Sequence, residues 1–198
     1  MTDVEISDRF IDYFSRITPL SAEEEAVFRD TLSIRRFGKN EFVLRDGDLA
    51  ISSFLVMEGC LREFVVKDGE EVTTNFYTEE QWAISMNNFT PGSRSIHNWV
   101  CMEDSVLIEG DEEEAIEFFK KFPRFETISR HIMEVSFAEQ KAALASYYTD
   151  SPEERYLKLQ RERPELLQKI PQYHIASYIG VKPESLSRIR KRIALGGD

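Results

Sequence analysis

The stretch PQYHIASYIGVKPESLSRIRKRIA, residues 171–194, contains two short helical patterns separated by a glycine. Three apolar residues form the inner face of the first pattern: Ile175, Ala176 and Ile179. Gly180 then supplies the left-handed conformation that often ends a helix, and Pro183 fits the first position of the next one. The second pattern has its own apolar stripe: Leu186, Ile189 and Ile193. Together these features predict a helix-turn-helix, with Val181 as the buried residue of the turn.

The outer face of the second predicted helix is polar and basic. In a helix-turn-helix this helix enters the major groove, where an arginine can hold guanine with two hydrogen bonds and a glutamate can accept one from cytosine. We therefore expect three residues to read base edges: Glu184, Ser185 and Arg188. Six others are expected to contact phosphates and set the register on the duplex: Tyr173, His174, Ser187, Arg190, Lys191 and Arg192. A solvated helical hairpin in an unrelated fold is the alternative.

The distribution of charge supports a nucleic-acid-binding end, although the formal net charge of the chain is −11. Residues 152–198 hold ten Lys and Arg against six Asp and Glu, a net of +4, which leaves −15 for residues 1–151. An acidic body joined to a basic end is typical of proteins that bind nucleic acid through that end. Charge alone is equally compatible with a solvated basic helix.

Before this basic end, the sequence changes from a helical to a strand pattern. Residues 4–33 predict helices, and Ser21 and Glu24 have the spacing of a capping box. Six short segments rich in Val, Phe, Ile and Thr then predict strands: 42–44, 53–57, 61–66, 71–77, 96–101 and 105–108. Asp68-Gly69 is a strong hairpin signal between two of them. Short strands at roughly ten-residue intervals predict a small barrel or jelly roll.

Two helices are predicted after the strands. Asp111 caps an acidic helix over 112–121, and Pro123 separates it from a long helix over 124–148. The long helix has an apolar stripe: Phe125, Ile128, Ile132, Val135, Ala142 and Ala145. Because solvent cannot satisfy such a stripe, it has to pack on the barrel or on a second copy of the helix. Ser151-Pro152 then predicts the cap and first residue of a further helix.

Several features limit the class of protein. No apolar run approaches the roughly 20 residues that span a bilayer, and the acidic N-terminus is unlike a secretory signal, so we expect a cytoplasmic protein with no membrane partner. The two cysteines and three histidines have no metal-ligand spacing, so neither a bound metal nor another cofactor is evident. A cupin-type enzyme would need clustered metal ligands, and His97 stands alone among the strands. We therefore expect no enzymatic activity.

These residues, placed after a β-rich domain and a long helix, resemble the Crp/Fnr family of transcription regulators, in the short form common among Bacteroidetes. The resemblance covers nearly the whole chain. FGKNEFVLRDGD (37–48), FLVMEGCLR (54–62) and DGEE (68–71) resemble the first half of a cyclic-nucleotide-binding jelly roll, and MEDSVLI (102–108) resembles its closing strand. IASYIGVKPESLSRIRK (175–191) is the closest match, with Glu184 and Arg188 on the family's base-reading positions.

The resemblance implies an α+β fold in three parts. Residues 1–123 would form a cyclic-nucleotide-binding-like sensor domain, a jelly roll flanked by helices. Residues 124–149 would form a long dimerisation helix, and residues 150–198 a small helix-turn-helix DNA-binding domain. A homodimer is then implied, whose paired recognition helices meet a palindromic site of double-stranded DNA about one helical turn apart. RNA polymerase is a further candidate partner.

The sequence departs from the family at the effector site. Cyclic-nucleotide binders of the family hold the ribose and phosphate with Gly-Glu, followed about ten residues later by Arg-Ser or Arg-Ala. Arg94-Ser95 is present, but the upstream stretch QWAIS (81–85) has neither Gly nor Glu. A ribose hydroxyl would lose its acceptor there, which argues against a cyclic nucleotide, whereas a small anionic effector at Arg94 stays open. The family's cysteine cluster for iron–sulfur sensing is absent, and Pro183 replaces a base-reading arginine of some members.

The sequence therefore predicts a regulator that binds specific DNA sites through its C-terminal helices, with a sensor domain whose effector is unknown. The alternatives are a regulator that needs no ligand, and an interaction module whose basic helices bind an acidic protein partner. Salt dependence and competition by a specific DNA site distinguish these possibilities, since DNA binding weakens steeply with salt.

Overall fold

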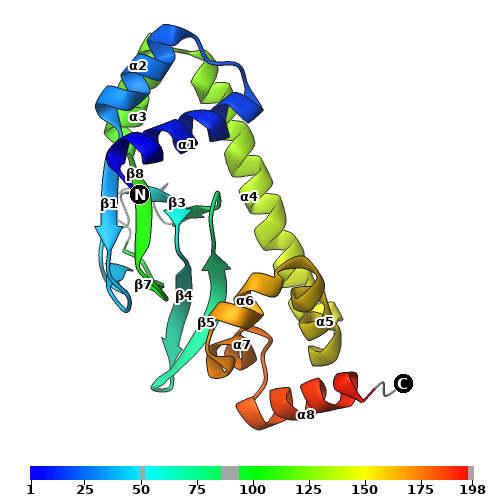
Figure 1. Ribbon diagram of the computed structural model, residues 1–198. Coiled ribbons are helices and arrows are strands. Elements are labelled where there is room, and N and C mark those ends of the chain that lie inside the picture. The colour runs from blue at the N-terminus through cyan, green and yellow to red at the C-terminus, as the bar shows by residue number, and fades with distance from the viewer. Residues whose placement is uncertain (50–51, 86–93, 196–198) are drawn as a thin grey trace. The chain divides into compact units, whose positions relative to one another are not determined.

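The computed structural model describes residues 1–49, 52–85 and 94–195 (Figure 1). The chain begins with two helices, α1 (Asp3–Ile17) and α2 (Ala22–Thr31). Within the described ranges, eight strands follow: β1 (Ser33–Phe37), β2 (Phe42–Leu44), β3 (Ser52–Glu58), β4 (Leu61–Lys67), β5 (Glu70–Tyr77), β6 (Trp82–Ile84), β7 (Asn98–Cys101) and β8 (Ser105–Asp111). The rest of the chain is helical: α3 (Glu112–Lys121), α4 (Arg124–Thr149), α5 (Pro152–Glu162), α6 (Pro164–Lys169), α7 (Gln172–Tyr178) and α8 (Pro183–Ala194). No helix in these ranges is both long and apolar enough to cross a membrane.

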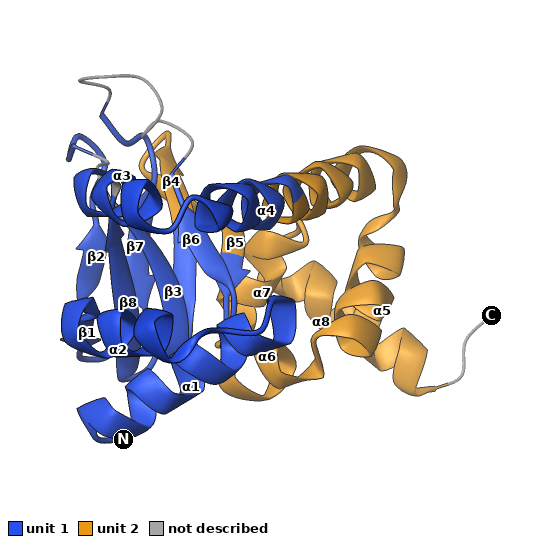
Figure 2. Cartoon of the chain, turned by 90° about the horizontal axis from the view of Figure 1, so that it is seen from above, with its two compact units in different colours: residues 1–63, 76–134 blue, residues 64–75, 135–198 orange. Residues whose placement is uncertain are grey.

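The chain divides into two compact units (Figure 2). The first, which we call the jelly-roll unit, comprises residues 1–63 and 76–134. The second, which we call the helical unit, comprises residues 64–75 and 135–198. Helix α4 begins in the first unit and ends in the second, because the division falls between residues 134 and 135.

The strands form two four-stranded sheets, as expected for a jelly roll. The hydrogen-bonded order is β1-β8-β3-β6 in one sheet and β2-β7-β4-β5 in the other. β8 pairs antiparallel with both β1 and β3, so Ile108 lies opposite Ile34 on one side and Leu55 on the other. The predicted hairpin between β4 and β5 is confirmed, because Asp68 and Gly69 have φ angles of 54° and 82°, which suit a tight two-residue turn.

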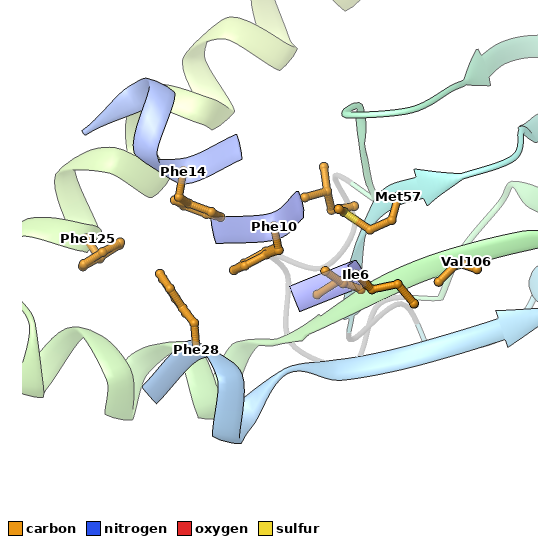
Figure 3. Close-up of a cluster of buried hydrophobic side chains, with 9 residues drawn as sticks. Ile6, Phe10, Phe14, Phe28, Met57, Val106 and Phe125 are labelled. Atoms are coloured by element: carbon orange, nitrogen blue, oxygen red, sulfur yellow. The ribbon is translucent and has the colours of Figure 1, made fainter. Parts of the chain in front are cut away.

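Two apolar clusters hold the jelly-roll unit together. One lies among the strands and includes Leu61, Leu107 and the fully buried Trp99. The other is rich in phenylalanine and joins α1, α2 and the start of α4 to β3 and β8 (Figure 3). Its aromatic rings contact one another edge-on or tilted, for example Phe28 and Phe125 at 5.4 Å between centroids.

An ion pair reinforces the attachment of α4. The capping box predicted at Ser21 and Glu24 is confirmed, and the same Glu24 carboxylate accepts hydrogen bonds from Arg124 at 2.7 and 2.5 Å. Burial alone would raise the pKa of Glu24, but the hydrogen bonds from Arg124 and Ser21 outweigh it and lower the pKa below its usual value. The start of α4 is therefore fixed to α2 within the jelly-roll unit.

Other sequence-based boundaries agree with the structure, with a few exceptions. Asp111 caps α3 and Ser151 caps α5, each as predicted. The predicted strand over 96–101 is two residues too long, because β7 begins at Asn98. The predicted strand over 105–108 is three residues too short, because β8 continues to Asp111. β1, β6 and α6 were not among the predicted elements; β6 and α6 have three and six residues, too few to show a periodic pattern.

Candidate nucleic-acid interface

Helices α7 and α8 form the predicted helix-turn-helix. After α7, Gly180 has a φ of +75°, the Val181 N–H donates to the Ala176 carbonyl at 2.9 Å, and the Gly180 N–H donates to Ser177 at 3.0 Å. This pair of bonds is the Schellman ending of a helix, in which glycine adopts the left-handed conformation without a steric penalty. Pro183 then occupies the start of α8, also as predicted.

The inner faces of the two helices are closely packed. Their apolar side chains are almost fully buried at Ile175, Ala176, Ile179 and Leu186. Leu166 and Ile170, from α6 and the residue after it, are also buried. Val181 and Ile193 are only half-buried, so the turn residue is less enclosed than the sequence predicts. The apolar core accounts for one face of α8 and leaves the other to solvent.

The outer face of α8 carries the predicted base-reading residues. Glu184 and Arg188 are exposed, and Ser185 is half-buried. The neighbouring Ser187, Arg190 and Lys191 are also exposed. Within the described ranges, the side chains of Glu184, Arg188, Arg190 and Lys191 form no hydrogen bond or ion pair. These four charged groups are therefore available to an external partner.

The other three residues predicted to contact phosphates interact with neighbouring side chains. Arg192 forms an ion pair with Glu153 of α5 and is about half exposed. Tyr173 is exposed, whereas His174 is buried with 8% of its surface accessible. The ring centroids of Tyr173 and His174 lie 4.0 Å apart with the rings tilted by 47°, so the buried histidine packs against the exposed tyrosine.

In the jelly-roll unit, the predicted effector residues bind other groups of the protein. Arg94 donates from Nη1 to the Gly47 carbonyl at 2.5 Å. Ser95 is buried, its hydroxyl donates to the His97 carbonyl at 2.8 Å, and it accepts from the His97 N–H at 3.0 Å. With the backbone bonds of Ser95 to Gly47 and Asp48, they hold residues 94–97, just before β7, against the turn at residues 45–48. Any effector would have to displace the Arg94 contact or bind beside it.

Sequence reasoning missed a carboxylate among these strands. Glu63 of β4 is largely buried and accepts hydrogen bonds from Trp99 at 2.9 Å and Tyr77 at 3.1 Å. His97 Nδ1 lies 3.5 Å from the same carboxylate, without the geometry of a hydrogen bond. The signal in the sequence is a charged pair, Arg62-Glu63, inside an otherwise apolar strand.

Among the described residues, neither unit offers an evident metal site. No group of three or more His, Cys, Asp or Glu with metal-binding geometry occurs in the part of the chain that the structure describes. Cys60 and Cys101 are both buried, and burial raises the pKa of the Cys101 thiol to about 11. This thiol is therefore protonated and unreactive near neutral pH.

The comparisons with known proteins match this architecture. Residues 34–122 match the family model of the cyclic nucleotide-binding domain. FixK2 from Bradyrhizobium japonicum is similar in structure, with a TM-score of 0.68 and 12% identity over 84% of this chain and 86% of that one. A putative Crp/Fnr regulator from Eubacterium rectale has a TM-score of 0.68 and 17% identity over 94% and 89%. The chain has the fold of the Crp/Fnr transcription regulators.

A third similar structure is a regulator described as responsive to c-di-GMP. It is CLP from Xanthomonas campestris, with a TM-score of 0.66 and 16% identity over 83% of this chain and 87% of that one. No protein with a curated description matches this chain in sequence. The fold that the resemblance to the Crp/Fnr regulators implies, a jelly roll followed by helices, is confirmed.

Proposed function

We propose that this protein is a sequence-specific DNA-binding regulator of transcription that acts in the cytoplasm as a homodimer on a palindromic site. The observation that carries the proposal is the outer face of α8, where Glu184, Arg188 and Lys191 are exposed and form no bond to another described residue. In a Crp/Fnr fold this helix is the recognition helix, and its side chains have the donors and acceptors that base edges require.

The expected roles divide by position along the helices. Glu184, Ser185 and Arg188 lie on the first two turns of α8, which is the part of a recognition helix that reaches the base edges. Ser187, Arg190 and Lys191 flank them and contact phosphates. Arg192 and Tyr173 add to the phosphate contacts, and His174 contributes by supporting the tyrosine ring.

The proposed dimer uses the second half of α4. The first half packs into the phenylalanine-rich cluster through Phe125, Ile128 and Ile132. The second half leaves large apolar side chains exposed along one face: Phe137, Leu144 and Tyr148. A row of such residues on one helix is costly in water, and a second copy of the same helix would cover it.

We also propose that the jelly roll is a sensor domain that binds a small effector. Members of this domain family bind small effectors, and Arg94 is the residue that an anionic effector would approach. The Arg94–Gly47 bond and the missing Gly-Glu pair argue against a cyclic nucleotide. RNA polymerase is a candidate partner of the DNA-bound form.

Selection of preferred sites from random duplex DNA tests the proposal. The wild-type protein is expected to enrich a palindrome, and an Arg188→Ala variant to lose preference at one base pair in each half. Arg161→Ala is the matched control, because Arg161 is an exposed arginine on α5, outside the helix-turn-helix. Failure of the wild type to enrich any sequence, with binding to acidic proteins instead, would favour the interaction module.

A further inference from the structure

Arg155 of α5 connects two helix ends within the helical unit. Its Nε donates to the carbonyl of Ile179, the last residue before the glycine turn, at 2.9 Å. Its Nη1 donates to the carbonyl of Tyr147 at 3.1 Å and to that of Asp150 at 2.5 Å. A single side chain thus binds the C-terminal end of α4 and the C-terminal end of α7.

The chemistry of helix ends explains why an arginine suits this place. The last carbonyls of a helix have no partner within the helix and form the negative end of its dipole. The guanidinium is always charged and presents its donors in a rigid plane, so it can satisfy several carbonyls in one fixed geometry. Because both helix ends are bound by the same plane, the direction of one is set relative to the other.

Tyr147 makes the same connection through its ring. The Arg155 guanidinium lies 4.9 Å from the centre of that ring. A Cβ atom added to Gly180 would lie 2.9 Å from both Cε2 and the hydroxyl of Tyr147. The turn of the helix-turn-helix therefore lies directly against the Tyr147 ring at the end of α4, and the φ angle of Gly180 favours glycine there.

The segment between α4 and α5 is also fixed locally. Thr149 donates to the Asp150 carboxylate at 2.9 Å, and Ser146 donates to it as well. These bonds hold the pKa of Asp150 below its usual value. The cap of α5 follows directly, with the Ser151 N–H donating to the Glu154 carboxylate at 2.7 Å.

We propose that Arg155, with Tyr147 as its support, is a positioning residue that sets the orientation of the recognition helix relative to the dimerisation helix. The inference rests on the proposed function. In a dimer, this orientation determines how far apart the two recognition helices lie. Arg155 therefore controls which spacing between half-sites the protein accepts, while the residues of α8 control which bases it prefers.

The test compares Arg155→Gln with Arg161→Gln, a matched control on the same helix. Arg161 is exposed and pairs only with the adjacent Glu162 among described residues. Each protein is titrated with palindromes whose half-sites are at the selected spacing or are moved by one or two base pairs. Wild type and Arg161→Gln are expected to prefer the selected spacing by at least tenfold. Arg155→Gln should bind all spacings within about threefold while it keeps the base preference in each half-site.

Tyr147→Ala provides a second variant in case Arg155→Gln does not fold. Its side chain is half exposed, so its removal leaves the core of the helical unit intact. It is expected to relax the spacing preference in the same way. Folded variants at both positions that retain the wild-type preference would overturn the proposal, as would equal losses of base and spacing preference.

Hydrogen exchange on the free protein separates this inference from the proposed function. Arg155→Gln is expected to speed exchange of the Asp150, Gly180 and Val181 amides together, at least tenfold relative to Arg161→Gln. If the wild type binds no DNA site but exchange at these amides rises together in Arg155→Gln, the proposed function is wrong. Arg155 would still link the ends of the two helices. If they do not respond together, Arg155 is not the connection, whatever the protein binds.

Discussion

In the jelly-roll unit Arg94 and Glu63 bind neighbouring groups of the protein, whereas in the helical unit Arg188 and Lys191 extend into solvent. A second contrast lies between the two ends of helix α4. Phe28 and Phe125 are buried in the first unit, while Phe137 and Leu144 on α4 are exposed in the second. The polar residues singled out in the jelly-roll unit are bound within the protein, whereas the helical unit exposes the charged face of α8 and the apolar face of α4. The partners of this protein are therefore to be sought first at the helical unit.

The largest expected effect comes from the apolar face of α4. Leu144→Glu places a charge on the face that we assign to the dimer, so the protein should become monomeric. Loss of the second recognition helix should weaken binding to the selected palindrome by about 10²–10⁴-fold. Sedimentation velocity and fluorescence anisotropy measure the two effects.

The control is Leu157→Glu, since Leu157 is an exposed leucine on α5. This variant should remain dimeric and bind DNA as wild type does. A Leu144→Glu protein that stays dimeric would show that α4 is not the dimer interface.

The burial of Cys101 in the jelly-roll unit can be tested by the rate at which its thiol is alkylated. Because burial raises the pKa of this thiol to about 11, against about 9 for an exposed one, its thiolate fraction at pH 8 is reduced about a hundredfold. Alkylation by iodoacetamide at pH 8 should be at least that much slower in the native protein than in urea. Peptide mapping follows the residue, and rapid native labelling of Cys101 would contradict the structure.

A smaller effect on DNA affinity is expected at Lys191, a proposed phosphate contact on the outer face of α8. Lys191→Ala should weaken binding to specific and scrambled duplexes alike. The slope of log K against log salt should fall by about 1, since one fewer counterion is released. Titrations over a range of salt concentrations measure this slope, and a loss confined to the specific duplex would place Lys191 at a base edge.

The smallest effect is expected from cyclic nucleotides. Cyclic AMP or cyclic GMP should leave the thermal midpoint of the protein unchanged, because the carboxylate that would hold the ribose is absent from residues 81–85. A true ligand at a hundred times its Kd would add about 2.7 kcal/mol. Differential scanning fluorimetry resolves a shift of that size, and its appearance would show that a cyclic nucleotide binds despite the missing carboxylate.

The features that sequence could predict are those with a local cause. Gly180 and Pro183 specify the ends of two helices through their own backbone preferences, and Ser21 and Glu24 specify a cap, so these were correct. Strand β6 was missed, because three residues form a strand only where β3 pairs with them.

The interactions that the sequence did not predict join residues far apart along the chain. Glu63 meets Trp99 across 36 residues, and Arg155 meets Ile179 across 24. No periodic pattern records such a pair. The sequence identified the exposed face of α8 because helical spacing alone separates it from Leu186 and Ile189.

The most direct test of the account is a double-mutant cycle between Arg188 and the base pair it is expected to read. Wild type and Arg188→Ala are titrated with the selected palindrome and with versions altered at each half-site position. We predict a coupling free energy of about 1–3 kcal/mol between Arg188 and one base pair of the half-site. At the other positions the two changes in binding free energy should add. Additive effects at every position would show that the outer face of α8 does not read bases through Arg188.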